Sequence, residues 1–111
     1  MTRDEILAMP AGRGMDVCIS EMFFKRKCHQ DFLGIWIENV AEHAHVLPRY
    51  SETYQGAMQI IGSPDVKELY FEKKSDEYFC MIGDNFDTAT KEKTFPLAIS
   101  RAALLAIMED E

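Results

Sequence analysis

Cysteine and histidine side chains that could hold a metal ion occur at two places in the chain. Cys28 and His29 are adjacent, and His43 and His45 follow with one residue between them. Thiolate and imidazole groups suit tetrahedral zinc, and alternate residues of an extended segment lie on the same side. The paired C-x-x-C spacing typical of zinc sites is absent from the sequence. We therefore expect either a structural zinc ion on Cys28, His43 and His45, with His29 as the fourth ligand, or exposed histidines beside an incidental thiol.

The same segment contains the residue types of a nucleophilic site. A catalytic cysteine needs a histidine base and an acid or amide that orients it, and Cys28, His43 and Asp31 could take these roles. Such an arrangement would make the protein a cysteine-dependent hydrolase. The other two thiols, Cys18 and Cys80, fall within a helical and a strand pattern, which favours packing in the core.

The chain is acidic, with 19 aspartates and glutamates against 12 lysines and arginines and a formal net charge of −7. Direct binding of nucleic acid needs clustered basic residues, so this composition argues against it. An acidic surface instead suits docking onto a basic protein. Exposed acids beside an apolar anchor are the expected contacts, and they are Glu21, Asp84 and Asp87 with Phe86. The alternative is that Phe86 folds back onto its own loop and the acids only solvate the surface.

The length of 111 residues fits a single domain, which we expect to span residues 1–111. The apolar runs are much shorter than a membrane span, and the N-terminus lacks the basic start and apolar block of an export signal. We therefore expect a cytoplasmic protein that binds no membrane. An odd number of cysteines without framework spacing indicates free thiols. Both a monomer and a homodimer remain open.

One stretch organises the elements that must position these residues. Pro48 keeps its predecessor extended, and Ser51 can then cap a helix that Gly62 ends. The spacing predicts a helix over residues 51–61 that packs on a sheet. Its expected buried stripe, at i, i+3, i+4 and i+7, consists of Tyr54, Ala57, Met58 and Ile61.

Three further helices are expected. Thr2 and Glu5 have the form of a capping box, which predicts a short helix at the start of the chain. A second helix follows over residues 10–24, and the last opens at Thr94. The residues off the apolar stripe of the second helix, which we expect to face water or a partner, are Asp16, Ser20 and Glu21.

Three strands are expected at residues 33–39, 68–72 and 77–83, the last two as an antiparallel hairpin, and residues 84–93 are expected to form a polar loop. Each strand pattern is apolar on both faces, so each requires cover on both sides. The sequence therefore predicts an α/β fold, a three-layer α/β/α sandwich with a small, mostly antiparallel sheet between helices.

Three further stretches, about half of the chain, are informative together: residues 1–13 with Asp16 and Glu21, residues 46–61, and residues 95–106. Together they resemble the phage ABA sandwich domain, a family of small phage and prophage proteins. The last stretch is the most specific. The chain departs from the family pattern at Glu52 and Thr53, where Thr-Asp is usual, and at Met58, where a Trp is usual. The resemblance implies a phage origin and the sandwich fold, and it implies no reaction.

Together these observations favour a non-enzymatic phage protein that binds and inhibits a host protein. The most concrete form of this hypothesis is an anti-CRISPR type of inhibitor, which would cover the basic nucleic-acid-binding surface of a host defence nuclease. One alternative is a small-molecule or zinc-binding module without catalytic activity. The other is the cysteine-dependent hydrolase described above.

Overall fold

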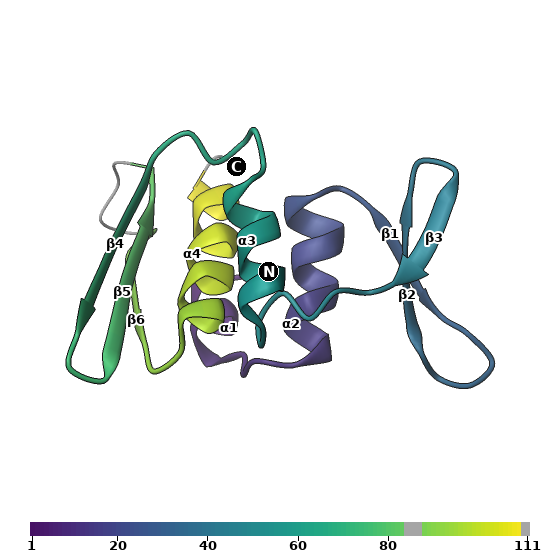
Figure 1. The fold of residues 1–111 in the computed structure, drawn as a ribbon, viewed down its shortest axis with the longest axis horizontal. Helices are drawn as coiled ribbons and strands as arrows, with labels where there is room; N and C mark the ends of the chain where they lie inside the picture. The colour runs from purple at the N-terminus through teal and green to yellow at the C-terminus, as the bar shows by residue number, and fades with distance from the viewer. Residues whose placement is uncertain (84–87, 110–111) are drawn as a thin grey trace.

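The computed structural model describes residues 1–83 and 88–109 (Figure 1). Within these residues the chain forms helices, one π-helical turn and short strands. In chain order they are α1 (Arg3–Ala8), α2 (Arg13–Cys18), η1 (Ile19–Phe23), β1 (Lys27–Gln30), β2 (Trp36–Val40), β3 (His43–Val46), α3 (Tyr54–Ile61), β4 (Leu69–Lys74), β5 (Glu77–Ile82), β6 (Thr90–Glu92) and α4 (Phe95–Glu109).

The strands form two separate antiparallel sheets at opposite ends of the molecule, with the helices between them (Figure 1). Sheet A has the order β1-β2-β3, and sheet B has the order β4-β5-β6. The predicted α/β class is confirmed, but the single sheet covered by helices on both faces is wrong. In the part of the chain that the structure describes, each sheet has helices on one face only, because the helices pack mainly against one another in the middle.

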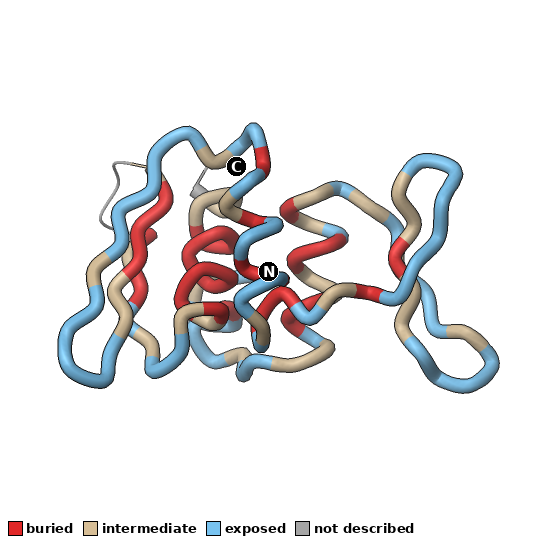
Figure 2. The backbone as a smooth tube through the Cα atoms, viewed as in Figure 1, coloured by how far each residue is buried: buried red, intermediate tan, exposed pale blue. Residues whose placement is uncertain are grey.

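The core surrounds α4, as the buried segments in Figure 2 show. The small side chains of Ala98, Ala102 and Ala103 allow α3 and β5 to approach this helix closely, and all three are fully buried. Larger side chains that complete the core include Ile6, Met15, Ile19, Leu47, Ile60, Cys80, Ile82, Leu104 and Leu105.

The N-terminal helices follow the sequence pattern closely. The Thr2 N–H donates to the Glu5 carboxylate at 3.1 Å and the Glu5 N–H donates to the Thr2 hydroxyl at 3.2 Å, which confirms the capping box. The second helix, predicted over residues 10–24, is present over residues 13–23 as α2 and η1, which run on without a break. A π-helical turn is rare and often marks a functional or strained position.

The N-cap of helix α3 lies two residues later than predicted, and the helix buries a different face. Thr53, not Ser51, is its N-cap, with its hydroxyl accepting from the Gly56 N–H at 3.0 Å. The buried residues are Gly56, Ala57 and Ile60. Tyr54 and Met58 are 60% and 56% exposed, so the predicted stripe is wrong except at Ala57 and, in part, at the half-buried Ile61.

This difference leads to a first prediction on stability. Ile60→Asp should lower the free energy of unfolding by about 3 kcal/mol or more, because it places an unpaired charge in the core. Met58→Asp, on the exposed face of the same helix, should change it by less than about 1 kcal/mol. Urea unfolding of both variants measures the difference. Equal losses of stability would mean that Met58 faces the core as Ile60 does, and that α3 is rotated relative to the structure.

The predicted hairpin of β4 and β5 is confirmed, with Ser75 in a left-handed conformation at its turn. The expected cover on both faces of these strands is wrong, because helix α4 packs on one face of β5 and β6 only.

Three strands were not predicted. β1 and β3 are short and largely exposed, and β6 lies within the segment expected to be a loop.

Candidate functional site

A tight turn between β1 and β2 presents two uncovered apolar side chains. The Asp31 carboxylate accepts from the N–H groups of Leu33 and Ile35, each at 2.9 Å. Backbone bonds from Asp31 to Ile35 at 2.9 Å and from Gly34 to Asp31 at 3.0 Å close the turn, and Gly34 adopts the left-handed conformation that the turn needs. Phe32 is nevertheless 95% exposed and Leu33 is 69% exposed. The turn is therefore held rigidly while its apolar side chains remain in water.

Three apolar side chains lie together on the adjoining face of sheet A. Ile37 pairs with Val46 across β2 and β3, and Ile35 precedes Ile37 by two residues, so the three side chains share a face. Val46 and Ile35 are both exposed. We name the exposed members of this region, Phe32, Leu33, Ile35 and Val46, the sheet A patch. Contiguous exposed apolar surface of this kind marks interaction sites in soluble proteins.

The opposite face of sheet A is joined to the helices through one buried carboxylate, that of Glu38. The hydroxyls of Ser20 and Tyr50 donate to it at 2.5 and 2.7 Å, and the Arg26 guanidinium donates at 3.1 Å. The imidazole of His45 lies 2.8 Å from it. Because Ser20 is on η1 and Tyr50 precedes α3, this network fixes the sheet, and with it the sheet A patch, on the helical body.

The network also sets the acidity of its members. Burial acts to raise the pKa of Glu38, but the hydrogen bonds from Ser20, Tyr50 and His45 and the charge of Arg26 outweigh it, so the pKa is lowered. Burial, and then the hydrogen bond to Glu38, raise the pKa of Tyr50. At neutral pH Glu38 is therefore a carboxylate and Tyr50 a neutral donor.

A second buried network corrects the expectation for residues off the helix stripe. Asp16 was expected to face water, but it is fully buried and accepts from the N–H and the hydroxyl of Ser51 at 2.8 and 2.7 Å. Arg13 pairs with it at 3.2 Å. Ser20, also expected outside, is buried against Glu38. Periodicity misplaces both residues because it ranks polar side chains as exposed whether or not a buried partner exists.

The structure separates the predicted zinc ligands. Cys28 and His45 both lie opposite Glu38, on its two neighbouring strands, so they are about 10 Å apart. His29 points to the other face of the sheet, where it contacts Asn39 at 3.1 Å, and His43 pairs with Val40 at the end of β3. Among the described residues no group of three or more metal-binding side chains is gathered.

The residues of the predicted nucleophilic site are separated as well. Strand β2 lies between Cys28 on β1 and His43 on β3, and the Asp31 carboxylate is engaged in its own turn. Burial is the largest influence on the pKa of Cys28 and raises it, against a smaller lowering by Ser20. The thiol is therefore less readily ionised than a free cysteine, the opposite of what nucleophilic activation requires.

Of the predicted partner-binding residues, Glu21 is exposed on η1, as expected. Its charge contributes to raising the pKa of Cys28, whose side chain shares the helix-facing side of sheet A with Glu38. Asp84, Phe86 and Asp87 lie outside the described residues. The prediction overlooked Phe32. An Asp and a Gly three residues apart, enclosing two large apolar residues, are a turn signal that could have identified it.

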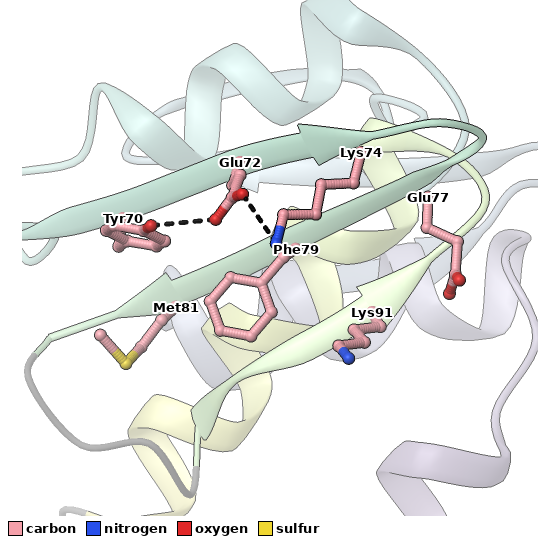
Figure 3. Close-up of a pocket in the computed structure, with 7 residues that line it drawn as sticks. All are labelled: Tyr70, Glu72, Lys74, Glu77, Phe79, Met81 and Lys91. Atoms are coloured by element: carbon pink, nitrogen blue, oxygen red, sulfur yellow. Dashed lines mark hydrogen bonds and ion pairs between the residues drawn. The ribbon is translucent and has the colours of Figure 1, made fainter.

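Sheet B carries a groove of about 490 Å³ on the face turned away from α4 (Figure 3). Tyr70, Phe79 and Met81 form its apolar floor, and the rings of Tyr70 and Phe79 meet edge to face at 5.7 Å. Glu72 accepts from Tyr70 at 3.0 Å and pairs with Lys74 at 3.3 Å. The groove is open and its rim carries charges of both signs.

Comparison with known proteins adds no assignment. No protein-family model, no curated protein and no solved structure matches the chain. In the part of the chain that the structure describes, no helix is long and apolar enough to cross a membrane.

Proposed function

We propose that the protein acts by binding another protein through the sheet A patch. The observation that carries this proposal is Phe32, which is 95% exposed on a turn closed by the Asp31 carboxylate. Leaving a phenylalanine in water gives no stability to the isolated fold, whereas burying it in a partner would release that hydrophobic energy. A rigid turn loses little conformational entropy on binding, which raises the affinity obtained from each contact.

The partner that we propose is a host protein with a basic, nucleic-acid-binding surface, such as a defence nuclease. The net charge of −7 supports a basic partner, and the exposed Glu21 on η1 adds one acid to the surface that could meet it. The phage connection rests on the sequence resemblance alone. On this proposal the protein has no catalytic role and inhibits by covering the site where nucleic acid would bind.

The test is a paired capture experiment with the full chain. Phe32→Ser with Leu33→Ser should weaken the captured partner's binding at least about thirtyfold, since buried aromatic anchors dominate interface energies. Leu7→Ser, which alters an exposed apolar residue of α1, is the matched control and should bind like the parent. Bacterial lysate is passed over all three proteins, and the affinity of each captured species is then measured with purified components.

The proposal predicts a captured protein that binds to the parent and to the control but not to the double variant. The parent should also prevent this captured protein from binding nucleic acid. A captured protein held equally by all three immobilised proteins would show that the sheet A patch is not the binding surface. A partner that is lost with the double variant but binds no nucleic acid would overturn the assignment of its class.

A further inference from the structure

Strand β4 is an edge strand whose inward side chains are only partly covered. It pairs with β5 on one side, and within the described residues no strand pairs with its other side. Leu69 and Phe71 share the face that turns toward the helices, yet they are 37% and 44% exposed. Helix α4 packs beneath β5 and β6, so β4 extends beyond its cover. An edge of this kind is a template for pairing with another strand.

The backbone groups that face this free edge can be identified. Gly83 donates its N–H to the carbonyl of Glu68 at 2.9 Å, so Glu68 and every second residue after it direct their backbone groups toward β5. Leu69, Phe71 and Lys73, which lie between them, therefore direct theirs toward the free edge. Three successive donor and acceptor pairs are available for a further strand.

We propose that β4 pairs antiparallel with β4 of a second copy of this chain, with Phe71 on the two-fold axis. In this register Phe71 faces its own mate and Leu69 lies opposite Lys73. Glu68 lies opposite Lys74, and Tyr70 lies opposite Glu72. Glu68 and Lys74 thus meet opposite charges. Glu72 meets the hydroxyl of Tyr70, and Lys73 meets the aliphatic side chain of Leu69, so no like charges lie opposite each other.

The two neighbouring symmetric registers lack this complementarity. A two-fold axis at Tyr70 places Glu68 opposite Glu72, and an axis at Glu72 places that residue opposite its own mate. Like charges directly opposite each other are destabilising. The charges of β4 therefore select both a second copy as the occupant and one register for it.

The pairing would also complete the aromatic cluster beneath β4. Phe71 meets Phe95 edge to face at 4.9 Å and stacks on Tyr78 at 5.9 Å, and Tyr54 stacks on Phe95 at 5.4 Å. Two such clusters would meet at the axis through the Phe71 pair and exclude water from it. Sheet B lies at the opposite end of the molecule from the sheet A patch (Figure 1), so this inference is independent of the proposed function.

Disulfide trapping tests the register. Opposed residues of an antiparallel pair have Cα atoms about 5.5 Å apart, within reach of a disulfide bond. Phe71→Cys should therefore form a cross-linked dimer under mild oxidation. Leu69→Cys is the matched control, because in the proposed register the two copies of this residue are about 14 Å apart. The parent chain, oxidised in parallel, measures cross-linking by the natural cysteines.

A charge variant tests the interface without altering the core. Glu68→Lys places a like charge opposite Lys74 twice in the dimer, so the dimerisation constant should weaken about tenfold. Sedimentation equilibrium of the parent and the variant measures the change. The concentrations should run from about 1 µM to 1 mM, because an interface made by one pair of short strands is weak. The proposal is overturned if the parent sediments as a monomer throughout, if both cysteine variants cross-link equally, or if the parent and Glu68→Lys dimerise alike.

Discussion

Replacing Glu38 with alanine should lower the free energy of unfolding by about 3 kcal/mol or more. The carboxylate is fully buried and accepts from Ser20, Tyr50 and Arg26, so its removal leaves buried donors without an acceptor. Sheet A should also loosen from the helices, because this network is its main polar attachment. Urea unfolding measures the loss, and Glu42→Ala, at an exposed position after the same strand, is the matched control.

The dependence of stability on pH provides a second measurement on this variant. The pKa of Glu38 is lowered from its ordinary value of 4.5 in the folded protein, so the unfolded chain binds more protons in this range. The contribution of Glu38 is fully present above pH 4.5 and is lost as the pH falls toward the folded pKa. The stability difference between the parent and Glu38→Ala should therefore shrink below pH 4.5. A constant difference down to pH 3 would mean that the carboxylate is not the source of the stabilisation.

Replacing Gly56 with alanine is expected to cost about 3 kcal/mol, although alanine is the better helix former by about 1 kcal/mol. A Cβ at this position would lie 2.4 Å from the Arg49 carbonyl oxygen and 2.6 Å from the Tyr50 Cα. Both atoms belong to the backbone, which cannot rotate away as a side chain would. Helix α3 would have to move outward, and Ala57 and Ile60 would lose their packing.

Gly14→Ala is the matched control, because Gly14 is also helical and nothing lies within 4 Å of the position of its Cβ. This variant should gain up to about 1 kcal/mol from the lower entropy of its unfolded chain. Thermal and urea unfolding of both variants give the comparison. If both variants were stabilised, the close approach of α3 to residues 49 and 50 would be refuted.

Gly56 also explains why the sequence pattern misjudged α3. A stripe at Tyr54, Ala57, Met58 and Ile61 is the more hydrophobic choice, and periodicity selects it. The structure rotates the helix so that its smallest residue faces the chain entering from Tyr50. Close packing of backbone against backbone outweighs the burial of one methionine, and the aromatic ring of Tyr54 stacks on Phe95 at the rim of the core.

The candidate site shows the same limit. The sequence identified the histidines and Cys28 by their chemistry, but the strand register places Cys28 and His45 two strands apart, His43 in another row and His29 on the other face of sheet A. Phe32 was overlooked because it directly precedes residues 33–39, which were expected to form a strand. Only the turn closed by Asp31 reveals that it remains outside.

Local signals alone determined the starts of the first and last helices and the hairpin. These features are the capping box at Thr2, the helix after Thr94, and the short polar turn between β4 and β5. Each depends on residues within one turn of each other, so the sequence contains the whole interaction. The tertiary structure decided the number of sheets, the rotation of α3 and the burial of Asp16 and Glu38. Each of these depends on partners that are distant in the chain, Ser51 for Asp16 and Ser20 for Glu38, and hydrophobic periodicity contains no information on such pairs.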